Sequence, residues 1–352
     1  MTTKLIHIAN PASVQDQELF GAAQIIREGG LVAFPTETVY GLGANALDEE
    51  AARKIYAAKG RPSDNPLIAH ISSYKELEPL VERIPETGRK LAECYWPGPL
   101  TMVFPKSGIV PYGTTGGLDT VAVRMPSDPV ASRLIALAGV PVAAPSANLS
   151  GRPSPTTARH VWQDMNGRID MILDGGAVGI GVESTIVDVS GEVPTLLRPG
   201  AITVEMLHET VGRIEIDPAI QGPPAEGLRP KAPGMKYRHY APRAEMTLVE
   251  GEGSAVVAAI NRLVRKDEAQ GRKVGIICTD ETRDQYPQGL LRSVGIRAQE
   301  ETIAHNLFAV LREFDDLAVD VIYSESFSQD HLGRAVMNRL MKAAGYKCLK
   351  VL

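Results

Sequence analysis

The sequence contains few cysteines and no long apolar segment. Its three cysteines, Cys94, Cys278 and Cys348, are far apart in a chain of 352 residues. This pattern disfavours a disulfide framework or a zinc site and is typical of thiols in a reducing compartment. Gly, Pro or a charged residue interrupts every apolar segment before it reaches the roughly 20 residues that span a bilayer. We therefore expect a chain without a membrane segment.

Two familiar nucleotide-binding patterns are also missing, the GxxxxGK[ST] phosphate loop and the GxGxxG fingerprint. If the protein binds a nucleotide, we expect it to use neither of these routes. The first ten residues contain no apolar core of a secretory signal. Together with the scattered cysteines, this predicts a cytoplasmic location.

Charge and length divide the chain into three parts. A chain of 352 residues is longer than one average domain, so we expect two. The net charge of -5 is uneven: residues 1–212 carry -6, residues 213–244 carry +3 and residues 245–352 carry -2. An acidic chain disfavours a general nucleic-acid binder. The proline-rich, basic middle part predicts a linker between domains 1–212 and 245–352.

Apolar periodicity predicts an α/β fold for both domains. In the first domain, short apolar strands alternate with helical spacing and polar residues follow the strands, which favours a twisted sheet around a central cleft. The predicted helices cover 16–28, 48–58 and 203–211, and the predicted strands include 31–34, 68–71, 102–104, 119–124, 141–145, 170–173 and 183–188. The smaller C-terminal domain alternates strands and helices in the manner of a doubly wound, Rossmann-like parallel sheet, and we interpret it as accessory.

The segment after the first buried strand is rich in hydroxyl groups. Pro35 fixes its own backbone, two threonines and a glutamate follow, and Gly41 and Gly43 close the segment. An ordinary strand and turn explains this stretch taken alone. Polar groups at the end of a buried strand also suit a ligand site in an open α/β sheet.

A second loop, residues 59–67, combines two cations with two prolines. Lys59 supplies a point charge and Arg61 a planar fork, a pair suited to a polyphosphate. A solvated charged loop is the simpler explanation, but Pro62 and Pro66 restrict the loop's freedom. His70 near the following strand end fits a core histidine, the commoner case, or a ligand contact.

Further polar residues at strand ends allow two interpretations each. Arg124 could lie in solvent or clamp a carboxylate or phosphate with two hydrogen bonds. Ser146 could contact a nucleotide or cap a helix, and caps are far commoner. In the linker, residues 232–242 are dense in Tyr, His and cations. Tyr237 in this stretch could therefore stack over a ligand as part of a lid.

In combination, these motifs give the first domain a sequence that resembles the YrdC-like family. The whole chain resembles the long, two-domain form of that family, the threonylcarbamoyl-AMP synthases. The motifs occur in family order at Pro35–Gly43, Lys59–Pro62, Asn65–Leu67, Trp96–Thr101, Val123–Pro126, Pro145–Asn148, Glu183–Thr185, Leu197–Gly200, Lys236–Pro242 and Gly333–Leu340. Any one motif is weak, but the ordered set is highly specific.

The resemblance implies an ATP-dependent nucleotidyltransferase. The family condenses L-threonine, bicarbonate and ATP to L-threonylcarbamoyl-AMP and releases pyrophosphate, the first step of tRNA t6A37 modification. It implies Mg²⁺ bound with ATP, no tightly bound organic cofactor and no metal ligand from the protein. Downstream t6A transfer enzymes are possible partners, and contact with tRNA is expected to be weak or indirect.

The resemblance also implies roles for individual residues. Lys59 and Arg61 would be catalytic, and Arg124 would hold the threonine carboxylate. The expected ATP contacts are Arg61, Asn65, Thr120, Ser146, Ser154, Arg198 and Tyr237. The expected L-threonine contacts are Thr38, His70, Arg124, Ala144 and Ser184.

Two other functions are compatible with a YrdC-like domain. One is a double-stranded RNA or tRNA-binding module without this catalysis, which the charge of -6 on residues 1–212 disfavours. The other is a carbamoyl-transfer domain of the kind that matures hydrogenases. That function predicts acylphosphatase-like and zinc-finger segments before the module, and the sequence has no cysteine pairs.

Overall fold

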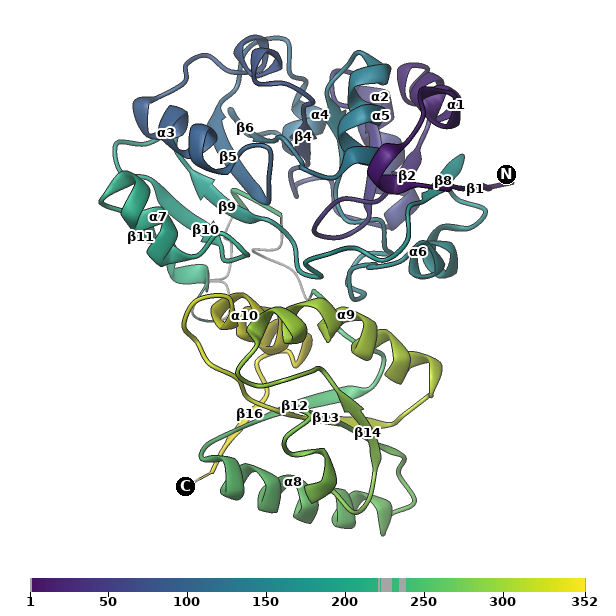
Figure 1. Cartoon of the computed structure of the whole chain (residues 1–352), viewed down its shortest axis with the longest axis vertical. Helices are drawn as coiled ribbons and strands as arrows, with labels where there is room; N and C mark the ends of the chain where they lie inside the picture. The colour runs from purple at the N-terminus through teal and green to yellow at the C-terminus, as the bar shows by residue number, and fades with distance from the viewer. Residues whose placement is uncertain (1, 221, 223–229, 234–238, 352) are drawn as a thin grey trace. The chain divides into compact units, whose positions relative to one another are not determined.

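In the computed structural model, residues 2–220, 222, 230–233 and 239–351 are described. The chain forms two compact units. The first consists of Met1–Ser150 and Ser154–Lys236, and the second of Gly151–Pro153 and Tyr237–Leu352. The division after Lys236 falls within residues 213–244, the predicted linker. Figure 1 shows the elements of both units.

The first unit is built on a mixed sheet. Within the described residues its eleven strands have the order β1-β8-β2-β3-β7-β4-β6-β5-β9-β10-β11. The strands are β1 Lys4–His7, β2 Val32–Phe34, β3 Gly41–Asn45, β4 Ile68–His70, β5 Leu100–Pro105, β6 Thr120–Arg124, β7 Val142–Ala143, β8 Met171–Asp174, β9 Thr185–Asp188, β10 Thr195–Arg198 and β11 Glu215–Ile216. The last strand, β11, comes from the predicted linker and pairs with β10 in parallel.

Seven α-helices accompany this sheet in the described part of the first unit. They are α1 Asp16–Arg27, α2 Glu49–Lys59, α3 Glu86–Tyr95, α4 Tyr112–Thr115, α5 Pro129–Ala138, α6 Ala158–Met165 and α7 Val204–Val211. Short 3-10 turns occupy Pro11–Ser13, Tyr74–Glu76, Glu78–Leu80 and Pro218–Ile220. Two of these turns and α3 account for most of residues 74–95.

Helix α2 ends where the sequence places its cations. Asp48 caps the start, its carboxylate accepting a hydrogen bond from the Glu50 amide. The helix stops because Gly60 has a left-handed conformation, with φ of 61°. Lys59 is thus the last helical residue, and Arg61 begins the loop that leads to β4.

Strands β2 and β3 form an antiparallel hairpin, with Phe34 opposite Gly41 and Val32 opposite Gly43. The expectation that these glycines close a turn is wrong, because both lie within β3. A side chain at Gly43 would place its Cβ only 2.6 Å from the Phe34 ring and 2.8 Å from Val142. The glycine therefore serves close packing inside the sheet, and Pro35 to Tyr40 form the hairpin loop.

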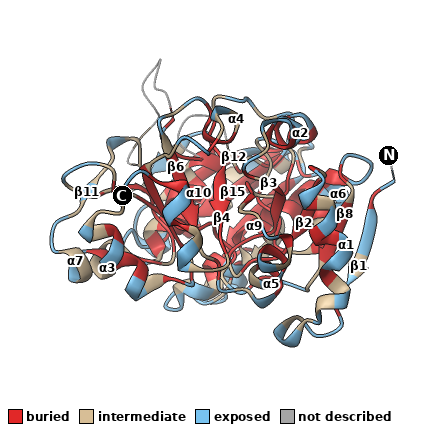
Figure 2. Cartoon of the chain, turned by 90° about the horizontal axis from the view of Figure 1, so that it is seen from above, coloured by how far each residue is buried: buried red, intermediate tan, exposed pale blue. Residues whose placement is uncertain are grey.

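Several apolar clusters among the described residues stabilise the first unit, and two of them are large. Helices α1 and α5 pack against β2 and β8 in one of them, with Leu19, Ile26, Phe34 and Leu134 fully buried. The larger cluster joins α2 and α3 to the middle of the sheet, around residues such as Leu42. Figure 2 shows the buried residues, in red, concentrated on the strands and the inward faces of these helices. The sheet is therefore held rigid where its strand ends carry polar residues.

The second unit is a doubly wound parallel sheet in the order β14-β13-β15-β12-β16, so the predicted fold class is confirmed for both units. Its strands are β12 Glu245–Glu250, β13 Val274–Cys278, β14 Leu290–Ser293, β15 Val321–Glu325 and β16 Cys348–Lys350. Helix α8 Gly253–Glu268 covers one face, and α9 Glu300–Asp316 and α10 Gly333–Ala343 cover the other (Figure 1). A 3-10 turn spans Arg283–Gln285. Strand β14 is half-buried along its length and shows no clear alternation of apolar and polar residues, so the sequence analysis did not predict it.

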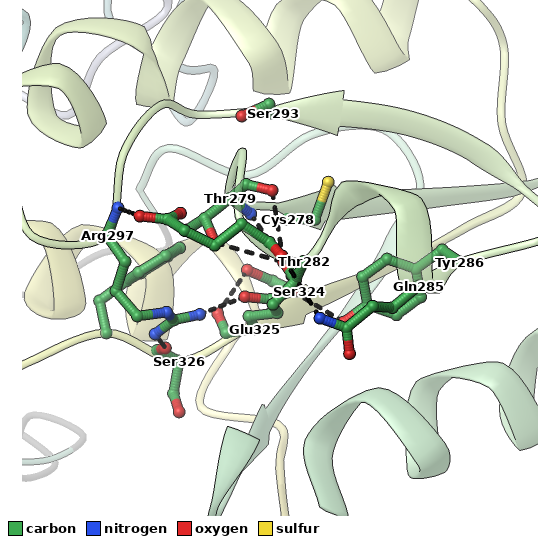
Figure 3. Close-up of polar contacts among 12 residues, drawn as sticks. Cys278, Thr279, Thr282, Gln285, Tyr286, Ser293, Arg297, Ser324, Glu325 and Ser326 are labelled. Atoms are coloured by element: carbon green, nitrogen blue, oxygen red, sulfur yellow. Dashed lines mark hydrogen bonds and ion pairs between the residues drawn. The ribbon is translucent and has the colours of Figure 1, made fainter. Parts of the chain in front are cut away.

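A buried carboxylate joins the strand ends of this second sheet (Figure 3). Glu325, at the end of β15, accepts hydrogen bonds from Thr282 Oγ1 and from Tyr286 Oη, the latter at 2.7 Å. Arg297 forms an ion pair with it and also donates to the Ser326 carbonyl. Burial and the Glu325 charge raise the pKa of Tyr286, which therefore stays protonated as a donor. The carboxylate is fully satisfied, and its role here is to hold the loops after β13 and β15 together.

No helix among the described residues is both long enough and apolar enough to cross a membrane.

Candidate functional site

The sheet register brings the expected threonine-binding residues together. His70, the last residue of β4, lies opposite Arg124 at the end of β6, and Arg124 lies opposite Thr101 of β5. Paired residues on neighbouring strands direct their side chains to the same face. Ala144 follows β7 directly, and its amide donates to the Ile68 carbonyl of β4 at 2.9 Å. Three residues that are distant in sequence, His70, Arg124 and Ala144, are thus placed by backbone pairing alone.

Arg124 is the central cation of this group, and only 4% of the residue is exposed. Its Nη1 donates to Thr38 Oγ1 at 3.0 Å, and its Nη2 lies 2.7 Å from Glu37 Oε1. Its Nε donates to the Gly98 carbonyl at 3.4 Å. The alternative that Arg124 lies in solvent is therefore excluded. A buried guanidinium fixed along its length presents a rigid fork, which suits carboxylate recognition.

Glu37 balances the charge of Arg124. Burial is the largest single effect and would raise the pKa of Glu37. The Arg124 guanidinium and the backbone amides of Glu37 and Ser127 together outweigh burial and hold the pKa below its ordinary value. Glu37 is consequently ionised at neutral pH, and a buried ion pair occupies the middle of the site.

His70 is a neutral residue in this environment. Its Nδ1 lies 3.1 Å from the Ile68 carbonyl, and since a carbonyl only accepts, Nδ1 carries the proton. Burial, reinforced by the Arg124 charge, lowers the pKa of His70 to about 3. The ring adds a polar but uncharged surface beside the ion pair.

We expect His70 to show no titration between about pH 5 and pH 8, the range in which an ordinary histidine changes charge. The folded pKa of about 3 lies below the ordinary 6.5, so the unfolded chain takes up this proton first. The stability linked to neutral His70 is complete above about pH 6.5 and is lost as the pH falls toward 3. The imidazole NMR signal, assigned with a His70→Gln variant, checks this; an inflection near pH 6.5 would contradict it.

Ser184 and Arg198 form a second polar group. Arg198 is buried at the end of β10 and donates through Nε to the Ser184 carbonyl at 3.0 Å and through Nη2 to Ser184 Oγ at 3.1 Å. Ser184 Oγ also lies 2.8 Å from Thr101 Oγ1, the hydroxyl opposite Arg124. An expected ATP contact and an expected threonine contact are therefore hydrogen-bonded to each other. The linker reaches this point as well, because the Pro233 carbonyl accepts from Arg198 Nη1 at 3.4 Å.

Lys59 is buried at the end of α2, which contradicts the simpler expectation of a solvated charged loop. Its Nζ donates to the Ser146 carbonyl and, at 2.6 Å, to the Asn148 carbonyl. The two carbonyls belong to the turn after β7, where Ser146 Oγ also lies 2.6 Å from Asn148 Oδ1. The ammonium group thus fixes the turn that carries an expected ATP contact.

The loop after Lys59 is folded around Arg61 and Asn65. Arg61 Nη2 donates to the carbonyls of Asn65 and Pro66 at 3.2 and 2.9 Å. Tyr56 Oη donates to the Asn65 carbonyl at 3.1 Å, and burial raises the pKa of Tyr56 to about 12, so it remains a donor. The Asn65 side chain is buried, yet its Oδ1 has no hydrogen-bond partner among the described residues. A buried acceptor without a donor is rare in a folded protein, and a donor from a bound ligand would satisfy it.

The other expected ATP contacts lie at separate places in the first unit. Ser154 is buried, and its hydroxyl donates to Glu183 Oε1, one residue before Ser184. Thr120 is the half-buried first residue of β6, at the opposite end of that strand from Arg124. Tyr237 lies outside the described residues, together with its neighbours at 234–236 and 238 in the predicted lid.

Both parts of the chain match known family models. Residues 24–200 match a model described as telomere recombination, whose name includes YrdC, and residues 202–345 match the C-terminal domain of threonylcarbamoyl-AMP synthase. The threonylcarbamoyl-AMP synthase of Pyrococcus abyssi is 52% identical over 96% of this chain and 97% of its own length. The chain belongs to the threonylcarbamoyl-AMP synthase family.

Further members of the threonylcarbamoyl-AMP synthase family give the same result. The enzyme of Bacillus subtilis is 47% identical over 99% of this chain and all of its own length. The crystal structure of P. abyssi Sua5 complexed with L-threonine has a TM-score of 0.94 and 50% identity, and covers 99% of this chain and 100% of that one. The resemblance to the two-domain form is therefore confirmed, and with it the expectation of an enzyme.

The sequence analysis assigned no role to three residues of the site. Glu37 pairs with Arg124, Thr101 contacts Ser184, and Glu183 holds Ser154. Glu37 and Glu183 were visible as carboxylates inside the motifs that flank Thr38 and Ser184. Thr101 was visible as the last residue of the Trp96–Thr101 motif, but its contact with Ser184 and its place opposite Arg124 come from strand pairing.

Proposed function

We propose that this chain condenses L-threonine, bicarbonate and ATP into L-threonylcarbamoyl-AMP and pyrophosphate, as a nucleotidyltransferase in tRNA t6A modification. The observation that carries this proposal is the buried Arg124 fork, flanked by Thr38 and neutral His70 and connected through Thr101 to Ser184 and Arg198. In this hydrogen-bonded region Arg124 can bind a carboxylate, and Arg198 is a second buried cation. Full-length similarity to synthases, and to a relative crystallised with L-threonine, supports the same function.

The threonine part of the site recognises an amino acid by charge and hydroxyl groups. Arg124 receives the carboxylate through its rigid guanidinium. Thr38 and Ser184 offer hydroxyls that donate or accept, and the Ala144 region contributes backbone. Because His70 is neutral, it does not repel a cationic amine.

The ATP part of the site supplies cations rather than a nucleophile. The threonine amine and bicarbonate give a carbamate and water, a carbamate oxygen attacks the α-phosphorus of ATP, and pyrophosphate leaves. Charge on the phosphates increases the need for fixed cations, and Lys59, Arg61 and Arg198 provide them. Catalysis in this proposal consists of positioning and electrostatic stabilisation, without a covalent protein intermediate. Asn65, Thr120, Ser146, Ser154 and Tyr237 are proposed to hold the nucleotide.

We propose that Mg²⁺ enters with ATP. In the described part of the chain, no group of three or more His, Cys, Asp or Glu side chains is placed to hold a metal ion. The side chains in contact at this turn are the Ser146 hydroxyl, the Asn148 amide and the Lys59 ammonium, so a Mg²⁺ there would keep its phosphate and water ligands. Bound there, Mg²⁺ would neutralise phosphate charge. The same proposal includes a cytoplasmic location, downstream t6A transfer enzymes as partners and only indirect contact with tRNA.

The test measures pyrophosphate release with ATP and Mg²⁺, omitting L-threonine and bicarbonate in turn. Release that requires all components supports the synthase. Release without threonine indicates another acceptor or simple hydrolysis. Absence of release from a folded protein contradicts the proposal and raises the RNA-binding alternative, for which salt-dependent tRNA binding is the measurement.

A further inference from the structure

Backbone hydrogen bonds hold the loop that carries Glu37. The Glu37 carbonyl accepts from the Ile180 amide at 2.9 Å, and the Thr38 carbonyl accepts from the Gly181 amide at 3.1 Å. Thr36 Oγ1 closes the loop by donating to the Val39 carbonyl at 2.7 Å. The hairpin loop is therefore anchored on both sides of Glu37, which fixes the backbone that carries the carboxylate.

The contact between Glu37 and Arg124 is close but incomplete. Oε1 lies 2.7 Å from Nη2 without the alignment of a hydrogen bond. The nearby amides of Glu37 and Ser127 also stabilise the charge, but neither oxygen has a well-aligned hydrogen-bond partner among the described residues. Both oxygens are nevertheless buried. A structural ion pair normally satisfies its acceptors fully, as Glu325 does in the second unit. The Glu37 carboxylate therefore retains capacity for another donor.

The charges around this ion pair match a zwitterion. Arg124 is positive, Glu37 is negative and His70 is neutral. Asp128 is also close, and burial raises its pKa to about 6, but its carboxylate caps α5 by accepting from the Ala131 amide at 2.9 Å. The carboxylate and ammonium groups of an α-amino acid are attached to one carbon, so their receivers must be adjacent. Among these groups, Glu37 is the anion in contact with Arg124.

We propose that Glu37 receives the ammonium group of the amino-acid substrate while Arg124 receives its carboxylate. Glu37 is thus a specificity-determining residue for zwitterionic amino acids. This inference rests on the proposed function, since it concerns the ligand of the same site. It requires that Glu37 distinguish an amine from a hydroxyl at the same carbon.

The experiment compares two ligands on the full chain by calorimetric titration. One is L-threonine, and the other is (2S,3R)-2,3-dihydroxybutanoate, which has a hydroxyl in place of the amine. For Glu37→Gln we expect L-threonine affinity to fall about 10- to 100-fold, the value of a hydrogen bond to a charged group, and affinity for the dihydroxy acid to change less than about twofold. The exposed Glu192→Gln serves as matched control and should change neither value.

Each other outcome overturns the inference. Equal losses for both ligands would mean that Glu37 only positions Arg124, and tighter L-threonine binding would mean that Glu37 competes with the substrate carboxylate. An unchanged L-threonine affinity would exclude any contact with the ammonium group. If the wild-type chain binds no L-threonine, the proposed function fails instead, so the two failures are distinguishable. A thermal unfolding curve for each variant shows that the fold is retained.

Discussion

Replacing Arg124 with alanine should raise the KM for L-threonine by about 100-fold while the KM for ATP changes less than about threefold. Truncating one partner of a buried, hydrogen-bonded charge pair costs about 2–5 kcal/mol, which corresponds to roughly 30- to 5,000-fold in affinity. Arg124 makes its contacts with Thr38, Glu37 and the Gly98 carbonyl, none of them an expected ATP residue. The loss should therefore fall on threonine. Steady-state pyrophosphate release with each substrate varied is the measurement.

Part of the Arg124→Ala effect will come from Glu37, which is left buried without its counter-charge. The double variant Arg124→Ala with Glu37→Gln removes both charges and should recover thermal stability without recovering threonine affinity. Arg133→Ala provides the matched control, because Arg133 pairs with Asp16 at the surface of the same unit. Equal losses for ATP and threonine would disprove the assignment of Arg124 to the threonine carboxylate.

Replacing Lys59 with methionine should lower kcat by about 100- to 1,000-fold, the usual effect of removing one preorganised electrostatic donor. Methionine keeps the length of the side chain but removes the ammonium group. The carbonyls of Ser146 and Asn148 then lose a buried donor, at about 1–3 kcal/mol for each unsatisfied group. We therefore expect a lower melting temperature together with slower pyrophosphate release.

Lys54→Met separates these two effects of Lys59. Lys54 is on the same helix, α2, and its Nζ also donates to a backbone carbonyl, that of Gly29, at 2.7 Å. Lys54 is exposed and makes one such bond, so Lys54→Met should lower stability less than Lys59→Met does. It should leave kcat within about twofold of wild type, because Lys54 lies apart from the site. If both variants lose activity in proportion to stability, Lys59 acts only as a structural residue.

Much of the fold was predictable from local sequence. The periodicity of residues 16–28 and 48–58 gave α1 and α2 within one or two residues, because Asp48 and Gly60 mark the ends of α2. Strand β3 was missed because its glycines are typical of a turn. The reason for Gly43, close packing against Phe34 of the neighbouring strand, appears only once the two strands are paired. Strand β14 was missed because it is half-buried along its length and shows no alternation.

The motifs by themselves determined the family, the presence of an enzyme and a set of polar residues at strand ends. The tertiary structure decided which of these residues meet, because strand pairing brings His70 to Arg124 and Arg124 to Thr101 across distances that no sequence spacing encodes. It also decided their charge states. Burial beside Arg124 keeps His70 neutral, and the same guanidinium keeps Glu37 ionised. Desolvation and proximity are properties of the packed chain, and for this reason only the fold could reveal the buried ion pair at the centre of the site.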